Sequence, residues 1–265
     1  MKIGVCIKQV PAGQNVPMDP NLGVLIRSGA ANIMNPYDLF AIEVALRVRE
    51  AAGGSVAAFT MGPPDAEQVL RLAFAMGVDE GYLLTDECFA GADVFATSFT
   101  LAQGITAAGR YDLIVCGQQT TDGDTAQVPF SLAEQLHLPV LGWVKEIEEV
   151  GTDRITVLQE MTGTIYRSQV RFPVVIAVNG NTVQPRLPTL RLKLKAAKMP
   201  VIILNLASMQ EQDPQRYGQR GSPTRVQKIS APAVVSKSCL ITTDAEKTAA
   251  LLAIAVAECG SEVAD

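Results

Sequence analysis

Residues 117–127, GQQTTDGDTAQ, combine the residue types that a nucleotide-binding loop requires. They follow the apolar run LIVC and bring together glycines, hydroxyl groups and amides, which can hold phosphate through backbone and side-chain donors. The loop also carries Asp122 and Asp124 and contains no lysine. The two carboxylates therefore need roles other than phosphate binding.

A helix that begins near Asp124 would use this side chain as its N-cap and would direct backbone N–H groups at phosphate. These N–H groups belong to Gly123, Thr125, Ala126 and Gln127. Asp122 would then accept hydrogen bonds from ribose or ribityl hydroxyls. Pro129 opposes such an early start because it removes an early helical hydrogen bond, so the regular helix is expected a few residues later.

The same residues also fit an ordinary strand-to-helix turn, and the loop alone does not decide between the two interpretations. The first apolar run is not followed by G-x-G-x-x-G, and the sequence contains no Walker motif. A nucleotide at this loop would therefore bind in a different mode.

The elements that must position this loop alternate between strand and helix patterns. Near-continuous apolar runs, typical of strands buried on both faces of a parallel sheet, lie at 2–10, 55–64, 80–85 and 112–117. Helical periodicity lies at 35–54, 65–77, 93–109 and 131–137. This alternation predicts an α/β fold with a mostly parallel, doubly wound, Rossmann-like sheet.

The helix at 35–54 has the clearest boundaries. Asn35 is expected to be its N-cap, Pro36 occupies the first helical position, Asp38 lies in the first turn, and a Gly-Gly pair ends it. This helix should begin at the carboxyl edge of the sheet.

From Trp143 the pattern changes to two-residue alternation around turn clusters at 151–153 and 162–163, which predicts antiparallel strands appended to the sheet. After residue 182 come a basic segment, a stretch rich in Gln, Ser and Pro, and a helix pattern at 243–259. We expect a nucleotide-binding domain at 1–182 and, at 183–265, a C-terminal arm and helix that pack on another chain.

Composition excludes several classes of function. The net charge of -5 disfavours nucleic-acid binding, and the five cysteines form no C-x-x-C pair, which argues against zinc, iron–sulfur clusters and disulfides. The N-terminal apolar run is broken by Lys8, and no run approaches membrane-spanning length. We expect a cytoplasmic protein without membrane insertion.

Ligands of open parallel sheets bind beyond the carboxyl ends of the strands, near the point where the strand order reverses. Four segments are predicted to lie there: CIKQVP (6–11), NPYD (35–38), MGPP (61–64) and GQQTTDGDTAQ (117–127). In this order and at these spacings they resemble the beta subunit of electron transfer flavoproteins. The resemblance continues to about residue 200 through PRLPTLRLKLKAAKMP (185–200).

This resemblance implies an adenine nucleotide, either a structural AMP or, in electron-bifurcating members, an FAD. The string DGDTAQ (122–127) resembles the bifurcating type. Hydride from NADH would then reach this FAD, with one electron passing to a low-potential acceptor such as ferredoxin and one to the FAD of an alpha subunit. By the same likeness the site would be lined by Cys6, Lys8, Asn35, Tyr37, Asp38, Met61, Gly117, Gln118, Gln119, Thr121, Asp122, Gly123, Asp124, Thr125, Ala126 and Gln127.

The family pattern also implies a heterodimer with the alpha subunit and a second partner, an acyl-CoA dehydrogenase-like or other flavin dehydrogenase. Leu190 would be the exposed anchor that docks into a pocket of that dehydrogenase. The alternative is an ordinary amphipathic helix packed on its own core.

Three functions remain open from the sequence: an FAD-binding bifurcating subunit, an AMP-binding electron carrier, and a nucleotide-binding regulatory protein without a redox role. Flavin would carry the chemistry, so no catalytic residue is expected, and whether the chain is an enzyme in its own right stays open. His137, the only histidine, is expected at a helix end.

Overall fold

The computed structural model describes residues 1–12, 32–227, 244 and 247–254. The chain divides into two compact units, Met1–Gln227 and Lys228–Asp265, and residues 247–254 of the second unit form a helix. Among the described residues no helix has the length and apolar character needed to cross a membrane. The domain boundary predicted after residue 182 does not coincide with the division in the structure.

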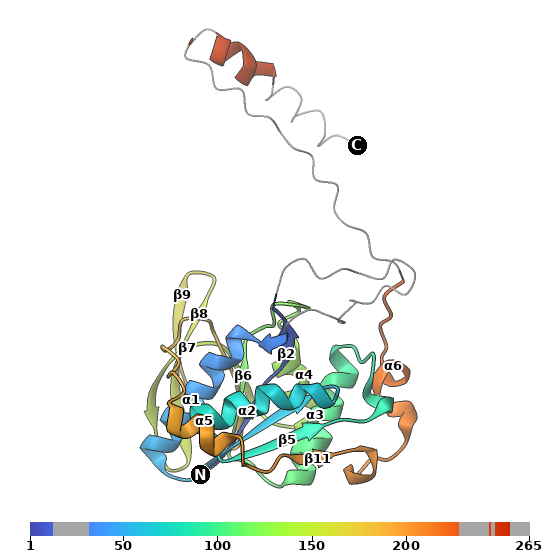
Figure 1. Ribbon diagram of the computed structural model, residues 1–265. Coiled ribbons are helices and arrows are strands. Elements are labelled where there is room, and N and C mark those ends of the chain that lie inside the picture. Colours follow the sequence, from blue (N-terminus) through green and yellow to red (C-terminus); the bar gives the residue numbers. More distant parts are fainter. Residues whose placement is uncertain (13–31, 228–243, 245–246, 255–265) are drawn as a thin grey trace. The chain divides into compact units, whose positions relative to one another are not determined.

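A nine-stranded sheet with the order β11-β5-β4-β1-β6-β10-β7-β8-β9 forms the centre of the first unit (Figure 1). Every pair of neighbours from β11 to β7 is parallel, and β8 and β9 continue the sheet in antiparallel pairing. The predicted mixed α/β sheet is confirmed. In chain order the strands are β1 (Lys2–Cys6), β4 (Ser55–Met61), β5 (Glu80–Leu84), β6 (Leu113–Gly117), β7 (Val140–Val150), β8 (Arg154–Met161), β9 (Thr164–Arg171), β10 (Val174–Val178) and β11 (Ile202–Leu204).

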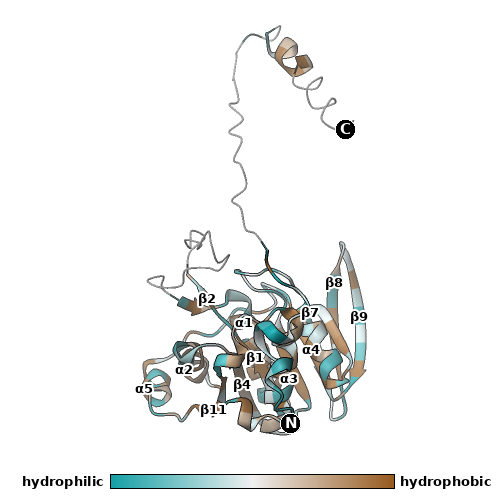
Figure 2. Ribbon diagram, turned by 90° about the vertical axis from the view of Figure 1, so that its right-hand side faces the viewer, coloured by the Kyte–Doolittle hydropathy of each residue, from teal (hydrophilic) through white to brown (hydrophobic). Residues whose placement is uncertain are grey.

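Helices cover both faces of this sheet, and Figure 2 shows β1 and β4 between α2 on one side and α3 on the other. The α-helices are α1 (Pro36–Ala52), α2 (Glu67–Met76), α3 (Val94–Ala108), α4 (Val128–Leu136), α5 (Leu190–Ala196) and α6 (Gly218–Gly221). Short 3-10 turns occupy Pro64–Ala66, Glu87–Phe89, Leu206–Ser208 and Pro214–Arg216.

Two apolar clusters result, one for each face. Residues of α1 and α2 belong to the first cluster and residues of α3 and α4 to the second. Along β1 the side chains alternate between them, with Ile3 and Val5 in the first cluster and Cys6 in the second. The doubly wound arrangement predicted from the alternation of strands and helices is therefore present.

Two strand predictions need correction. The apolar run at 2–10 is not one strand: β1 ends at Cys6, and β2 (Gln9–Pro11) pairs with β3 (Asn32–Met34) in a separate two-stranded sheet. The last strand of the expected antiparallel set, β10, instead lies between β6 and β7 and is parallel to both. All five residues of β10 are buried, and its unbroken apolar run VVIAV is typical of such a strand.

Helix ends follow the local sequence. Pro36 starts α1, the side chain of Asp93 accepts a hydrogen bond from Ala96 N at the start of α3, and Gly77 ends α2 with φ 117°. His137 ends α4 in the left-handed region at φ 55°. This confirms the helix-end position expected for the only histidine.

The segment after residue 182 packs largely on its own unit. Strand β11 pairs with β5, and α5 contacts α2. Tyr217 is fully buried, with ring centroids of Phe89 and Phe99 at 5.1 and 5.3 Å. Residues 183–227 therefore belong to the same core as the sheet, because β11 and Tyr217 bury apolar area that the sequence alone did not assign to it.

Candidate functional site

The strand order reverses between β1 and β6. From β1 the chain proceeds to β4 and β5 on one side of the sheet and then crosses to β6 on the other side of β1, where β10 and β7 follow β6 in the sheet. Cys6 and Cys116 are register partners at the carboxyl ends of these two strands. This is the position where open parallel sheets bind ligands, and three of the four predicted segments are joined there by hydrogen bonds.

Asp38, in the first turn of α1, connects the start of this helix to the end of β1. Its Oδ2 accepts a hydrogen bond from the backbone N–H of Lys8 at 2.6 Å, and its Oδ1 accepts one from Asn35 Nδ2 at 2.9 Å. Burial raises the pKa of Asp38 to about 7, although the hydrogen bonds from Asn35 and Lys8 act in the opposite direction. The side chain is thus a buried acid at the centre of the site.

Asn35 connects the same helix start to the loop after β6. Its Nδ2 also donates to the carbonyl of Gln119 at 2.9 Å, and its Oδ1 accepts from the backbone N–H of Thr121 at 3.3 Å. The expected N-cap hydrogen bond from the Asn35 side chain is not formed. The fully buried side chain instead holds the loop, a role that its position alone did not reveal.

The lysine that the loop lacks is supplied by the segment after β1. Lys8 Nζ lies 2.7 Å from Asp122 Oδ2 and 2.8 Å from its Oδ1, across 114 residues of sequence. Gly123 N donates to the same carboxylate at 2.8 Å. Burial opposes ionisation of Asp122, but these hydrogen bonds, that from Lys8 above all, hold its pKa below the ordinary value.

This ion pair answers the question that the two loop carboxylates raise. The side chain of Asp122 is only 10% exposed and already compensated, so the loop presents less negative charge than its sequence indicates. Lys8, whose side chain is 41% exposed, brings a cation to the edge of the loop. An anion such as phosphate would meet this ammonium group as well as backbone donors.

Gly117 permits the close approach of the loop to α1. A Cβ atom at this position would lie 2.5 Å from Asp38 Oδ1 and 3.0 Å from the Tyr37 carbonyl carbon. Across the site, Gln119 Nε2 donates to the Tyr37 hydroxyl at 3.0 Å. Only glycine fits at 117 without displacing the helix start.

The loop itself does not begin a helix at Asp124. Helix α4 starts at Val128 with Gln127 as the N-cap residue and Pro129 in its first turn, so the N-cap role predicted for Asp124 is wrong. Pro129 lacks the N–H of an interior helical residue and is tolerated only in the first turn, which moves the helix start past the loop.

Two non-glycine residues of the loop adopt positive φ, Asp124 at 47° and Ala126 at 52°. Such conformations cost on the order of 1 kcal/mol each and gather at functional sites. Ala126 is followed by Gln127 in the right-handed region, a succession that turns neighbouring N–H groups toward one side and suits anions. A run of three consecutive amides at the end of the loop, those of Thr125, Ala126 and Gln127, donates to no described residue.

Gln118 and Met61 take positions apart from this network. Gln118 is 2% exposed, and its Oε1 accepts from Trp143 N at 2.8 Å, while its Nε2 has no partner among the described residues. Met61 ends β4 and packs against the second apolar cluster. Contact of either residue with a ligand stays a prediction.

Cys6 and Cys116 face the second cluster and are buried. The hydrogen bond with Cys6, followed by burial, raises the pKa of the Cys116 thiol well above its ordinary value. Cys116 is therefore a neutral thiol, which suits a packing role better than nucleophilic chemistry.

Two hollows lie outside this network. One of about 520 Å³ adjoins the loop and combines Thr125 and Gln127 with the aromatic side chains of Phe95 and Phe130. The aromatic residues were not predicted, because nothing in the local pattern of α3 or α4 distinguishes them from core residues. Trp143, 39% exposed, lies against Phe130 with ring centroids 5.4 Å apart.

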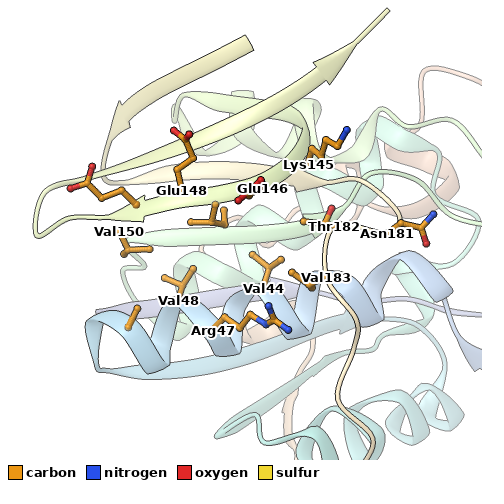
Figure 3. Close-up of a pocket in the computed structure, with 13 residues that line it drawn as sticks. Val44, Arg47, Val48, Lys145, Glu146, Glu148, Val150, Asn181, Thr182 and Val183 are labelled. Carbon is orange, nitrogen blue, oxygen red and sulfur yellow. The ribbon is translucent and has the colours of Figure 1, made fainter. Parts of the chain in front are cut away.

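The other hollow, of about 510 Å³, lies between α1 and β7 (Figure 3). Val44, Val48 and Val183 form its apolar floor, and charged residues of β7 line its other side. None of the predicted site residues lines it, so the strand-end network and this cleft are separate features.

Comparison with known proteins agrees with this geometry. Residues 22–209 match the model of the electron transfer flavoprotein domain. The chain is 41% identical over 232 residues to an electron transfer flavoprotein subunit beta of Thermoanaerobacterium thermosaccharolyticum, with 88% of each chain covered. It is 39% identical over 239 residues to the subunit beta of Megasphaera elsdenii and 38% identical over 233 residues to the caffeyl-CoA reductase-Etf complex subunit CarD of Acetobacterium woodii, again with 88% of each chain covered.

Proposed function

The chain belongs to the electron transfer flavoprotein family, in which it is of the beta-subunit type, and we propose that its strand-end site holds the adenine nucleotide of an FAD. When bound, FAD supplies hydride acceptance from NADH and the division of the two electrons between ferredoxin and the FAD of an alpha subunit. The remaining steps of the proposal concern what this chain's own residues do.

The observation that carries the choice of FAD is the hollow beside the loop. An AMP needs only the strand ends, whereas the hollow extends the site by about 520 Å³ past Thr125 and Gln127 and offers aromatic side chains. Ligand sites of drug-sized molecules span about 300–1,000 Å³ and are rich in aromatic residues. The residues present therefore fit a ligand that continues past its phosphates to a planar ring.

The phosphates of the nucleotide are proposed to lie against the amides of residues 125–127, which have no partner in the described part of the chain, and the ammonium group of Lys8. Asp122 holds the side chain of Lys8 in place, Asp38 holds the backbone of Lys8, and Asn35 holds the backbone of the loop. The role first expected for Asp122, accepting from ribose or ribityl hydroxyls, is compatible with its remaining lone pairs.

The partners are proposed from the family. We place this chain in a heterodimer with an alpha subunit, and we assign to Leu190 the contact with an acyl-CoA dehydrogenase-like or other flavin dehydrogenase. Leu190 is 74% exposed at the start of α5, which fits an anchor that a partner covers. A cytoplasmic location stays a prediction.

The test is the nucleotide content of the chain copurified with its alpha subunit. We expect two FAD and no AMP per heterodimer, measured by flavin absorbance and by chromatography of the released nucleotides. One FAD with one AMP would contradict the FAD assignment, and the absence of both from this chain would contradict the nucleotide site itself.

A paired variant tests the loop. Asp122→Ala with Thr125→Ala should lower the nucleotide content while the sheet stays folded, because it removes the partner of Lys8 and a loop hydroxyl. Thr152→Ala with Asp153→Ala makes the same two changes in the β7–β8 turn and should retain the nucleotide. Equal nucleotide content in both double variants would remove the loop from the site.

A further inference from the structure

Arg186 attaches the segment before α5 to helix α1. Its backbone N–H and its Nε donate to Glu43 Oε2 at 3.1 and 2.7 Å, and its Nη2 donates to Glu43 Oε1 at 3.2 Å. The remaining Nη1 donates to Glu50 Oε1 at 2.7 Å. A planar guanidinium group that binds two carboxylates in this way fixes direction as well as distance.

Glu43 requires charged hydrogen-bond partners, because its side chain is only 4% exposed and its carboxylate has little contact with water. Burial alone would raise the pKa of Glu43, but the hydrogen bonds from Arg186 and Arg47 outweigh it and lower the pKa. Removing one member of a buried ion pair leaves an uncompensated charge, which strongly disfavours the altered arrangement. The position of Arg186 is therefore well determined, although 143 residues separate it from Glu43.

Arg71 attaches the other end of α5 to helix α2. Its Nη1 donates to the carbonyl of Ala196, the last residue of α5, at 2.9 Å, and to that of Met199, three residues further on. Glu67 Oε1 accepts from Arg71 Nε at 2.9 Å and from Nη2 at 2.6 Å, which orients the guanidinium group. Carbonyl groups at a helix end have no intrahelical donor, and Arg71 supplies one.

Between these two attachments α5 presents apolar side chains to solvent. Leu190 and Leu194, four residues apart in α5, are 74% and 64% exposed and share one face of the helix, and Leu187 in the segment before it is 88% exposed. Basic side chains surround them: Arg191, Lys193, Lys195 and Lys198. A helix of seven residues is marginal alone, so the packed side of α5 and its two arginine attachments must hold this face outward.

We propose that Arg186 and Arg71 are positioning residues that hold α5 and the segment before it with Leu187, Leu190 and Leu194 outward, ready to enter an apolar pocket rimmed by carboxylates on a redox partner protein. This inference rests on the docking role proposed above for Leu190. A face that is ordered before association avoids the entropy loss of ordering it on binding, and the basic side chains complement an acidic rim.

The first measurement is backbone hydrogen exchange in the heterodimer with the alpha subunit. In Arg186→Gln the amides of 187–199 should exchange at least about tenfold faster, because local opening of this segment no longer has to break the hydrogen bonds with Glu43. The amides of β1 and β6 should keep their exchange rates. Arg47→Gln is the matched control, since it removes a guanidinium group from the same carboxylate without touching the segment before α5. Unchanged exchange in Arg186→Gln would overturn the proposal.

The second measurement is reduction of the heterodimer by an acyl-CoA dehydrogenase supplied with its acyl-CoA substrate. Arg186→Gln should raise the KM for the heterodimer about tenfold with kcat changed less than about twofold, because docking and not flavin chemistry is affected. Arg186→Lys should recover part of the loss. If Arg186→Gln fails to fold, Glu50→Gln replaces it, because this variant removes only the exposed half of the attachment. Glu50→Gln should raise KM in the same direction but by less. A fall in kcat without a rise in KM would contradict the inference.

Leu190→Ala separates this inference from the docking role on which it rests. It should raise KM while leaving the exchange of 187–199 unchanged, because the attachments stay intact. If KM does not rise in Leu190→Ala, the docking role is wrong, whereas the exchange rates of Arg186→Gln still support or overturn the attachment of α5 by themselves.

Discussion

Helix α1 holds both the strand-end site and the α5 arm, which is the segment from Arg186 to Met199, but one is a buried network and the other exposes apolar side chains. At the N-terminus of α1, Asp38 and Asn35 draw two distant segments inward and bury their polar groups against one another. Further along α1, Glu43 and Glu50 hold Arg186, and the arm beyond it exposes leucines. The comparison teaches that hydrogen-bonded carboxylates on one helix can order both a buried polar network and an exposed apolar segment.

The strand-end site and the α5 arm should respond differently to substitution. In the strand-end site the side chains of Asn35, Asp38 and Asp122 each bond to another segment of the chain, so a change of one atom affects several segments. In the arm the exposed side chains contact little of their own chain, so their removal should alter association and not folding. Four tests, taken from the largest expected effect to the smallest, would break or sharpen this contrast.

Gly117→Ala should have the largest effect. The new Cβ would lie 2.5 Å from Asp38 Oδ1, and displacing the start of α1 should lower the free energy of unfolding by up to about 3 kcal/mol and reduce nucleotide content. Gly123→Ala is the control, since its Cβ has only Thr120 Oγ1 within 4 Å, at 3.8 Å. Thermal unfolding of both variants measures the difference, and equal stability would show that the close approach at 117 is not required.

Asp38→Asn should lower the free energy of unfolding by about 2 kcal/mol at pH 4, because an amide NH₂ would replace one of the two oxygen atoms that accept from buried donors. This difference between wild type and variant should shrink as pH rises. With a folded pKa of about 7 against an ordinary 3.8, native Asp38 binds more protons than the unfolded chain between these values, so the wild type loses stability from about pH 4 to about pH 7. Urea unfolding across this range should show the slope in the wild type only, and a parallel slope in Asp38→Asn would assign it to another group.

The Lys8–Asp122 ion pair should contribute less. A double-mutant cycle with Lys8→Met and Asp122→Asn should give a coupling energy of about 1 kcal/mol, since Asp122 is largely shielded from solvent although Lys8 is not. The same cycle on Lys145 and Glu160, which pair at 2.9 Å with both side chains well exposed, should give a smaller value. Equal coupling in the two cycles would show that the site does not strengthen its ion pair.

Leu190→Ala should change the free energy of unfolding least, by less than about 0.5 kcal/mol, because its side chain is 74% exposed. Leu204→Ala, in the edge strand β11 and 9% exposed, is a matched substitution that should lower it by about 2 kcal/mol or more. Chemical denaturation measures both. A large loss in Leu190→Ala would mean that the arm depends on this leucine for folding and would weaken its interpretation as a partner contact.

The sequence by itself determined much of the local structure. Apolar periodicity identified the four strands and the helices between them, and the glycine, proline and acidic residues at their ends predicted most boundaries within a few residues. Because parallel strands share one carboxyl edge, it also placed the four candidate segments at the same edge of the sheet. These inferences depend only on neighbours along the chain, which the sequence displays directly.

Only the tertiary structure decided which distant residues meet. It placed β10 between β6 and β7, brought Lys8 to Asp122 over 114 residues and joined Arg186 to Glu43 over 143 residues. It also turned Asn35 from a cap into a link to the loop, whereas the start of α4 past Asp124 had already been expected from Pro129. The type of a residue and its place in the apolar periodicity indicate how buried its side chain will be. Which distant residue it contacts depends on strand order and helix packing, and these are set by the burial of the whole core.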